Sequence, residues 1–225
     1  MKRILEFTIS MIVVTMLFSN SYGQDTIMRI RGLRVGADLS RLALQYVDKE
    51  RNGYEFSVDF EAFKNFYPTV HYGWQTLSVK KNEYQYSSTG SYWRIGAEYN
   101  ALKKIKYNQY EMVFVGLGYG FSSFTQQADS VYINDNHWGD YYTSILPMQY
   151  KDGWIEVTSG IRAELFKNFF IGWYFSGRIL LWHTHDSPLV PYKSPGFGTI
   201  EQKSSLGFNY SVYYRIPLFK VRYEE

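Results

Sequence analysis

The sequence predicts an all-β protein, an eight-stranded antiparallel up-and-down transmembrane β-barrel with a polar, salt-bridged interior. Three observations support this prediction. Apolar and polar residues alternate over eight separate segments, which is the pattern of strands with two different faces. The polar face carries both charged residues and many glycines, whereas aromatic residues gather on the apolar face. A segment with the features of an export signal precedes all eight.

The first 23 residues have the three parts of a signal peptide. Lys2 and Arg3 supply the basic start, and residues 9–18 form an apolar segment that is too short to cross a membrane as a helix. Small and polar residues follow, and cleavage is expected after Gly23. We therefore expect a signal peptide at residues 1–23 and one outer-membrane barrel domain at residues 24–225.

The composition sets further bounds. The chain has 225 residues, a net charge of +3, 20% aromatic residues and no cysteine. This length suits one barrel with its loops. The charges alternate in sign along the strands and do not cluster, so we expect no nucleic-acid partner. The absence of cysteine excludes disulfides and thiolate metal sites.

The second predicted strand shows the alternation most clearly. Its apolar residues, among them Phe56 and Val58, alternate with Glu55, Ser57 and Asp59. The strongest hairpin signal lies later, where two alternating arms flank a short polar break at residues 167–168. The eight predicted strands cover residues 33–39, 54–62, 70–75, 92–99, 113–121, 155–165, 171–179 and 206–216.

The predicted connections alternate in length. Those after the second, fourth and sixth strands are short or compact, and those after the third, fifth and seventh are long and polar, at residues 80–90, 125–152 and 183–205. Bacterial outer-membrane barrels show this asymmetry, with short periplasmic turns and longer external loops.

Glycine placement indicates which face of the strands points inward. The lumen of an eight-stranded barrel is only wide enough for side chains to fill it, so small residues belong there. Gly36, Gly73, Gly96 and Gly160 all lie on the charged face, and Gly177 is the main exception. We therefore predict that the charged face is inside and that the lumen is plugged, unlike that of a porin. The expected interior charge network consists of Arg34, Asp38, Glu55, Asp59, Glu61, Arg94, Glu98, Arg162, Glu164, Arg178 and Arg215.

Both signs of charge are present in this network, so paired arginines and carboxylates offset the cost of burying each ion. Aromatic residues near the strand ends fit interfacial girdles. The predicted periplasmic girdle contains Phe63, Phe66, Tyr67, Tyr99, Tyr110, Phe166 and Phe169. The predicted outer girdle contains Tyr46, Tyr54, Phe124, Trp154 and Trp182.

With these features the chain resembles the small eight-stranded outer-membrane β-barrel proteins of Gram-negative bacteria. It is most similar to an uncharacterised family with a Pro-Gly-Phe-Gly segment, here Pro195–Gly198, before a Tyr-Arg-Ile-Pro ending. We expect a monomer in outer-membrane lipid, and the resemblance implies assembly by machinery that recognises the last strand. That strand usually ends in an aromatic residue, whereas here Lys220–Glu225 follow Phe219.

A second, more local resemblance concerns catalysis. His185, Ser187 and Glu201 resemble the site of barrel enzymes that remove an acyl chain from lipid A, which implies Ser187 as nucleophile, His185 as base and Glu201 as the group that orients the imidazole. Those enzymes have Asn after the serine, whereas this chain has Pro188. A lipid A-type acyl hydrolase is therefore the alternative function, and a solvated loop is the simpler interpretation.

Other functions receive less support from the sequence. His183 and His185 lack fixed third and fourth ligands for zinc, so no metal and no cofactor is expected. The segment at residues 125–152 offers aromatic groups for surface recognition, namely Tyr132, Trp138, Tyr141 and Tyr142. A soluble periplasmic lipocalin-like barrel, with its apolar face inside around a ligand, is the third possibility.

Overall fold

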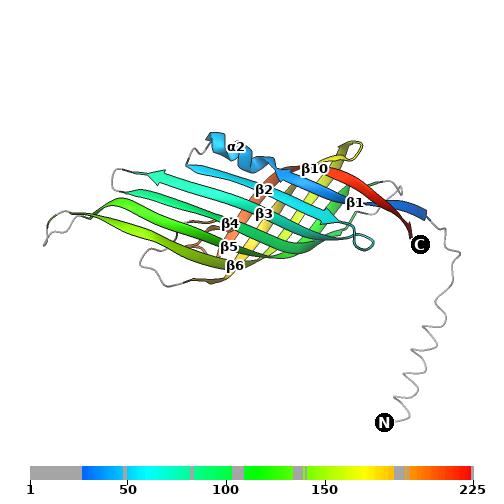
Figure 1. Cartoon of the computed structure of the whole chain (residues 1–225). Coiled ribbons are helices and arrows are strands. Elements are labelled where there is room, and N and C mark those ends of the chain that lie inside the picture. Colours follow the sequence, from blue (N-terminus) through cyan, green and yellow to red (C-terminus); the bar gives the residue numbers. More distant parts are fainter. Residues whose placement is uncertain are drawn as a thin grey trace, which may run out of the picture. The chain divides into compact units, whose positions relative to one another are not determined.

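The computed structural model describes residues 27–47, 50–81, 84–102, 109–133, 139, 141–184, 191 and 193–223. Eight long strands form one closed antiparallel barrel, in which the last strand closes on the first (Figure 1). The predicted fold class is confirmed. The strands are β1 (Ile27–Asp38), β2 (Arg51–Phe60), β3 (Phe66–Lys80), β4 (Gln85–Asn100), β5 (Met112–Ile133), β6 (Tyr141–Phe166), β7 (Phe169–His183) and β10 (Ser204–Tyr223).

The barrel occupies the compact unit Ile30–Phe219. The predicted signal peptide and its cleavage site lie outside the described residues. Across the part of the chain that the structure describes, no helix is both long enough and apolar enough to cross a membrane.

The charged face of the strands points into the barrel. Along β2, Glu55, Ser57 and Asp59 are buried, while Phe56 and Val58 between them are exposed. This distribution contradicts the lipocalin-like alternative, which needs Trp93, Trp173 and Tyr210 buried in the lumen. Instead Trp93 is 40% exposed and Trp173 is 38% exposed on the outer face.

Glycines on the inward face make room for large aromatic side chains from other strands. A Cβ atom added to Gly73 would overlap the ring of Tyr92, and one added to Gly36 would overlap the ring of Tyr213. By contrast, a Cβ at Gly177 would meet only Leu206 Cδ2, at 3.9 Å. The rings of Tyr92 and Tyr213 therefore lie in the lumen against glycines of other strands.

A helix follows the first strand and corrects the sequence prediction. Helix α2 (Leu39–Val47) was not predicted, and the first predicted strand ended one residue inside it. Asp38 caps the helix, because its Oδ1 atom accepts hydrogen bonds from the backbone nitrogen of Ser40 at 2.8 Å and from its hydroxyl. Leu39, Leu42 and Tyr46 recur at helical spacing, which is the signal that favours this helix.

The segment at residues 125–152 was predicted to be a loop, and this is wrong. Strand β5 continues to Ile133 and β6 begins at Tyr141, so most of the segment is a long hairpin. The pairing of β5 with β6 shifts register twice, between Gln126 and Ala128 and between Ala128 and Val131. These irregularities interrupt the alternation that reveals a strand. Residues 80–90 are corrected in the same way, because β4 already begins at Gln85.

The last long connection also contains structure. Within residues 183–205, β8 (Lys193–Ser194) pairs with β9 (Gly198–Thr199) to form a two-stranded hairpin. Gly196 and Gly198 have φ angles of 79° and 121°, which only glycine adopts without strain. The Pro-Gly-Phe-Gly segment is therefore the tight turn of this small hairpin.

Three members of the predicted aromatic girdles belong to the interior instead. Tyr67, Phe124 and Trp154 are buried. Trp154 has the same parity along β6 as the inward-facing Glu156, so the alternation itself places its indole in the lumen. The side chain of Tyr46 lies outside the described residues.

Candidate functional site

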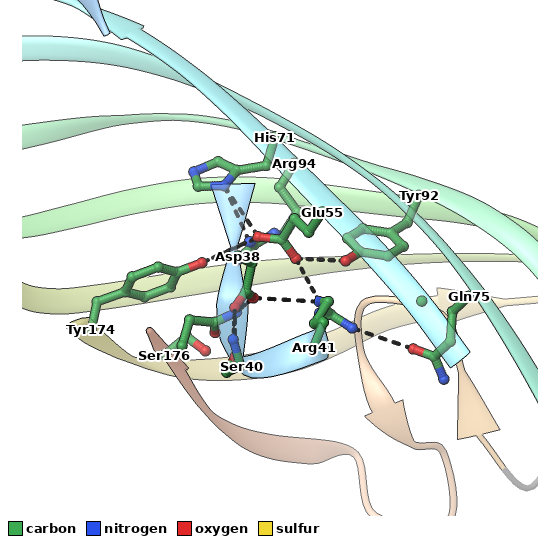
Figure 2. Close-up of polar contacts among 12 residues, drawn as sticks. Asp38, Ser40, Arg41, Glu55, His71, Gln75, Tyr92, Arg94, Tyr174 and Ser176 are labelled. Atoms are coloured by element: carbon green, nitrogen blue, oxygen red, sulfur yellow. Dashed lines mark hydrogen bonds and ion pairs between the residues drawn. The ribbon is translucent and has the colours of Figure 1, made fainter. Parts of the chain in front are cut away.

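The interior of the barrel is the candidate site, and Arg94 of β4 lies at its centre (Figure 2). Its Nη1 atom donates to both carboxylate oxygens of Glu156 on β6, at 2.8 and 3.0 Å. Its Nη2 atom donates to Glu55 on β2 and to the hydroxyl oxygen of Tyr174 on β7, the latter at 2.9 Å. One guanidinium therefore connects four strands across the lumen.

Glu55 is the main acceptor of this network. Besides Arg94, it accepts a hydrogen bond from the Tyr92 hydroxyl at 2.5 Å and one from Arg41 Nε at 3.0 Å. His71 Nδ1 lies 3.3 Å from its other oxygen. Because both oxygens are satisfied by several donors, the ionised carboxylate is held in the interior without an uncompensated charge.

Arg41 reaches this network from α2, which is not part of the barrel wall. Its Nε atom also lies 3.6 Å from Asp38 Oδ2. Burial alone would lower the pKa of Arg41, but Tyr92, Glu55 and Asp38 together raise the pKa above its ordinary value. The helix is thus tied to the lumen by a side chain that stays protonated.

A second layer of charge crosses the lumen around Arg162 of β6. Its Nη1 atom lies 3.2 Å from Asp59 Oδ2, and its Nη2 atom donates to Glu98 Oε1 at 2.8 Å. Arg34 Nε donates to the other oxygen of Asp59 at 2.7 Å. The guanidinium of Arg162 also lies over the ring of Tyr213, at 4.5 Å from its centroid. We call these two networks the Arg94 layer and the Arg162 layer.

The remaining predicted network members lie at the ends of the layers. Arg178 pairs with Glu156 in the Arg94 layer, and Asp38 accepts from Asn209 as well as capping α2. Glu61 is buried. Arg215 donates to Asn168 Oδ1 at 3.1 Å and lies over the Tyr110 ring. These residues continue the polar interior toward both mouths of the barrel.

Glu164 corrects the predicted network. It is only half-buried, and its Oε1 atom accepts a hydrogen bond from the backbone nitrogen of Asn168 at 2.6 Å. Asn168 has a positive φ of 66° in the turn between β6 and β7. Glu164 therefore stabilises the turn and does not pair with an arginine of either layer.

A hydrophobic cluster lies in the lumen on the side of α2. Phe197, at the tip of the β8–β9 hairpin, is fully buried, and its ring centroid lies 5.8 Å from that of Trp154. Arg178 Nη1 donates to the Phe197 carbonyl oxygen at 3.3 Å, and the hydroxyls of Ser194 and Ser122 are 2.9 Å apart. The hairpin is therefore held inside the barrel both by packing and by hydrogen bonds.

Sequence analysis missed several members of the Arg94 layer. Tyr92 and Tyr174 have the same parity as the charged residues of their strands, so the alternation was a usable signal for both. Glu156 lies on the polar face of its predicted strand by the same alternation, but the predicted network does not include it. Arg41 lies in the helix that was not predicted, and no strand pattern could have found it.

The candidate catalytic and surface residues lie in other places. His185, Ser187 and Trp138 lie outside the described residues, so the hydrolase interpretation stays a prediction. Glu201 is exposed in the bend before β10. Tyr132 and Tyr142 pair across the far end of the β5–β6 hairpin, with ring centroids 5.4 Å apart, and Tyr141 is beside them. Among the described residues, no group of three or more His, Asp or Glu side chains is arranged to hold a metal ion.

Comparison with known protein families assigns the chain to a family of unknown function. A family model described as a domain of unknown function, DUF6048, matches residues 2–221. The chain belongs to this family. No curated protein matches the chain.

Three solved structures are similar to this family member. Neisserial surface protein A is 9% identical, with 86% of this chain and 99% of that chain covered and a TM-score of 0.40. A major outer membrane protein from Thermus thermophilus is 10% identical, with 83% and 98% covered and a TM-score of 0.45. CarO from Acinetobacter baumannii is 11% identical, with 83% and 97% covered and a TM-score of 0.40.

We predict that the Arg94 layer is a major source of stability. Replacement of Arg94 by Met leaves Glu55 and Glu156 buried with too little positive charge, so unfolding should become easier by roughly 3–5 kcal/mol. Urea titration of the refolded protein in detergent, followed by tryptophan fluorescence, measures this change.

The exposed Lys80 provides the matched control. Lys80→Met should change the free energy of unfolding by less than about 0.5 kcal/mol. In Arg94→Met/Glu156→Gln, part of the lost stability should return because one unpaired charge is removed. A loss below about 1 kcal/mol in Arg94→Met would show that the layer is not important for stability.

Proposed function

We propose that this protein spans the outer membrane as a closed, non-porin barrel with a structural or surface-interaction role. The observation that carries the proposal is the inverted polarity of the barrel. Large apolar side chains cover the outside, where Ile95, Leu117 and Val157 are 54%, 66% and 56% exposed. Arginines and carboxylates fill the inside. Water would favour the opposite arrangement, whereas lipid favours this one.

The hydrogen bonding of the backbone supports a lipid environment for the same strands. In hydrocarbon, every backbone N–H and C=O group needs an internal partner. A closed antiparallel barrel provides these partners wherever its eight strands form the ring, because each strand there is paired on both sides. Export through the signal peptide expected at residues 1–23 supplies the route to the outer membrane.

The lengths of the connections support an orientation. The turn between β6 and β7 contains only Lys167 and Asn168, and a short turn also joins β2 to β3. At the other end, β5 and β6 extend past the point where β6 last pairs with β7, at Asp152 and His183 (Figure 1). In bacterial barrels the short turns face the periplasm. We infer that the extended β5–β6 hairpin faces the cell exterior.

Two features of the interior support a closed lumen. The Arg94 and Arg162 layers each connect opposite walls, and Phe197 fills the mouth beside α2. A cavity beside Arg94 has a volume of about 20 Å³, and one beside Arg34 and Arg215 has about 10 Å³. Each holds about one water molecule, which does not amount to a conducting column of water.

The extended hairpin supports a role in surface interaction. At its far end Tyr141 is 47% exposed, Tyr142 is 71% exposed and Leu146 is 74% exposed. Rigid tyrosines of this kind provide large contact areas at a small cost in side-chain entropy. Tyr132, Tyr141 and Tyr142 are therefore the residues that we propose for surface recognition, together with Trp138 of the connection between the two strands.

Quenching of tryptophan fluorescence by brominated lipid tests the inverted polarity. In vesicles, the outward Trp173 should be quenched by contact with acyl chains, and the inward Trp154 should not. We expect Trp173→Phe to lose part of the quenchable signal and Trp154→Phe to keep all of it. Cooperative folding in plain buffer without any quenching by lipid would refute the membrane barrel.

Planar-bilayer recording tests the closed lumen. We expect no stepwise conductance from the reconstituted protein, because the two charged layers cross the lumen. Phe197→Ala should also stay silent, since it opens the mouth but leaves both layers in place. Steady conductance steps from either protein would contradict the closed lumen.

Cysteine labelling in intact cells tests the orientation, because the natural chain contains no cysteine. A membrane-impermeant maleimide should label Tyr142→Cys in the hairpin on intact cells. The matched variant Lys167→Cys lies in an exposed turn at the other end of β6 and should be labelled only after the outer membrane is permeabilised. The reverse pattern would invert the orientation and remove the surface role of the hairpin.

A further inference from the structure

The cavity of about 20 Å³ beside Arg94 lies where the Arg94 layer and the Arg162 layer meet. Arg94 of the first layer and Glu98 of the second both line it. On β4 these two residues flank Gly96, which pairs with Gly118 of β5 and also lines the cavity. The ion pairs within each layer and the proposed surface role do not account for this space.

The missing side chain of Gly118 provides part of the space. A Cβ atom added there would have the Ile95 carbonyl oxygen as its nearest neighbour, at 3.2 Å, and its three nearest atoms all belong to the backbone of β4. At Gly36 and Gly73 the corresponding position overlaps a tyrosine ring. Among the described residues no ring covers Gly118 in this way, so the space in front of it belongs to the cavity.

The wall of this cavity contains residues with unsatisfied polar atoms. Arg94 Nε is buried and donates no hydrogen bond to a described residue, although both Nη atoms of the same guanidinium do. Glu98 Oε2 is buried and lies 2.8 Å from Arg162 Nη1, but it accepts no hydrogen bond of suitable geometry from the described residues. Thr69 and Thr158 add hydroxyl groups to the wall. Because a buried polar atom without a partner is unfavourable, these groups favour a small polar ligand.

Charge and volume indicate which ligand fits. Glu156 at the wall pairs with Arg94 at 2.8 Å, and Glu98 pairs with Arg162 at the same distance. An added ion would therefore lack a counter-charge in the interior, so the ligand is neutral. A water molecule needs a cavity of at least about 10–15 Å³ and about two to four polar partners. The cavity and its polar groups meet both conditions for one water molecule.

We propose that this cavity binds one water molecule that joins the Arg94 layer to the Arg162 layer. The water accepts a hydrogen bond from Arg94 Nε and donates one to Glu98 Oε2, and the hydroxyls of Thr69 and Thr158 complete its set of partners. Hydrogen bonds in a chain polarise one another, so the two layers act as one network across the lumen. This inference does not depend on the surface role of the protein.

Nuclear magnetic resonance of the refolded protein in detergent, with isotope-labelled arginine, tests for the bound water. The Nε–H signal of Arg94 is identified as the one that Arg94→Lys lacks. In a rotating-frame Overhauser experiment, a bound water and chemical exchange with the solvent give cross peaks of opposite sign. We expect the Arg94 Nε–H of the wild type to show the cross peak of a bound water.

Two substitutions of Gly118 separate the water from the space that it occupies. Gly118→Ala places a methyl group in the cavity and should abolish the water cross peak. Gly118→Ser adds the same Cβ atom together with a hydroxyl that replaces the water, so it should also lack the cross peak but unfold at a temperature about 2–4 °C higher than Gly118→Ala. Gly177→Ala is the control, because its Cβ would meet only Leu206 Cδ2 at 3.9 Å, and it should keep the cross peak.

The link between the layers has a separate readout. Glu98→Gln should shift the Arg94 Nε–H resonance in the wild-type background, because the water transmits the change. The same substitution should shift this resonance much less when Gly118→Ala has displaced the water. An equal shift in both backgrounds would show that the cavity does not link the layers.

Two further results would overturn the proposal. One is an Arg94 Nε–H signal in the wild type without the cross peak of a bound water. The other is a shift of this signal when gluconate replaces chloride in the buffer, which would identify an anion in place of the water. Both measurements use the wild type, so they decide the question even if Gly118→Ala folds poorly.

Discussion

The pairing of Glu55 with Arg94 is the interaction on which the rest of the structure depends. A barrel of eight strands has no room for bulk water around its inward charges, so each charge needs a partner from another wall. Arg94 provides one by reaching Glu55 and Glu156 at once, and Arg41 of α2 and Arg178 of β7 attach to the same two carboxylates. The position of helix α2 and that of the β8–β9 hairpin both follow from these attachments.

Different interactions stabilise the two halves of the lumen. Around the Arg94 and Arg162 layers, directional hydrogen bonds fix the distances between strands. Toward α2, a hydrophobic cluster forms inside a barrel whose outside is also apolar, and its members include Tyr92, Phe124, Tyr150, Trp154 and Phe197. This cluster packs around the turn of the β8–β9 hairpin. The interior thus holds two charged layers in the middle and a cluster of aromatic rings toward the mouth.

The inward or outward direction of the strand side chains could be predicted from the sequence, because successive side chains of a strand point to opposite faces. Once the glycines and charges show which face of a strand points into the lumen, the alternation places Glu55 and Asp59 inside and Phe56 outside. The partners of each charge could not be predicted in this way. Arg94 joins β4 to β2 and β6, which are not neighbours of each other, and such contacts depend on the tilt and register of the closed barrel.

Sequence analysis missed several elements for one physical reason. None of them has a long, uninterrupted periodic pattern of apolar and polar residues. Helix α2 is short and follows a strand directly, the β5–β6 hairpin contains two register shifts, and β8 and β9 have two residues each. The girdle assignment of Trp154 failed for another reason. Trp154 lies near a strand end, as girdle residues do, but it has the same parity as Glu156, and parity decides the direction of a side chain in a strand.

The hydrogen bond from Asn209 to Asp38 has a consequence for the order of folding. Its two residues are 171 positions apart in the chain, yet Asp38 is also the cap of α2. The capping carboxylate therefore reaches its final surroundings only when the last strand has arrived beside the first. Contacts of such long range form slowly, since the closure of a long loop comes before any gain from the contact. We expect α2 to be the latest local element to mature, a helix whose formation reports that the ring of strands is complete.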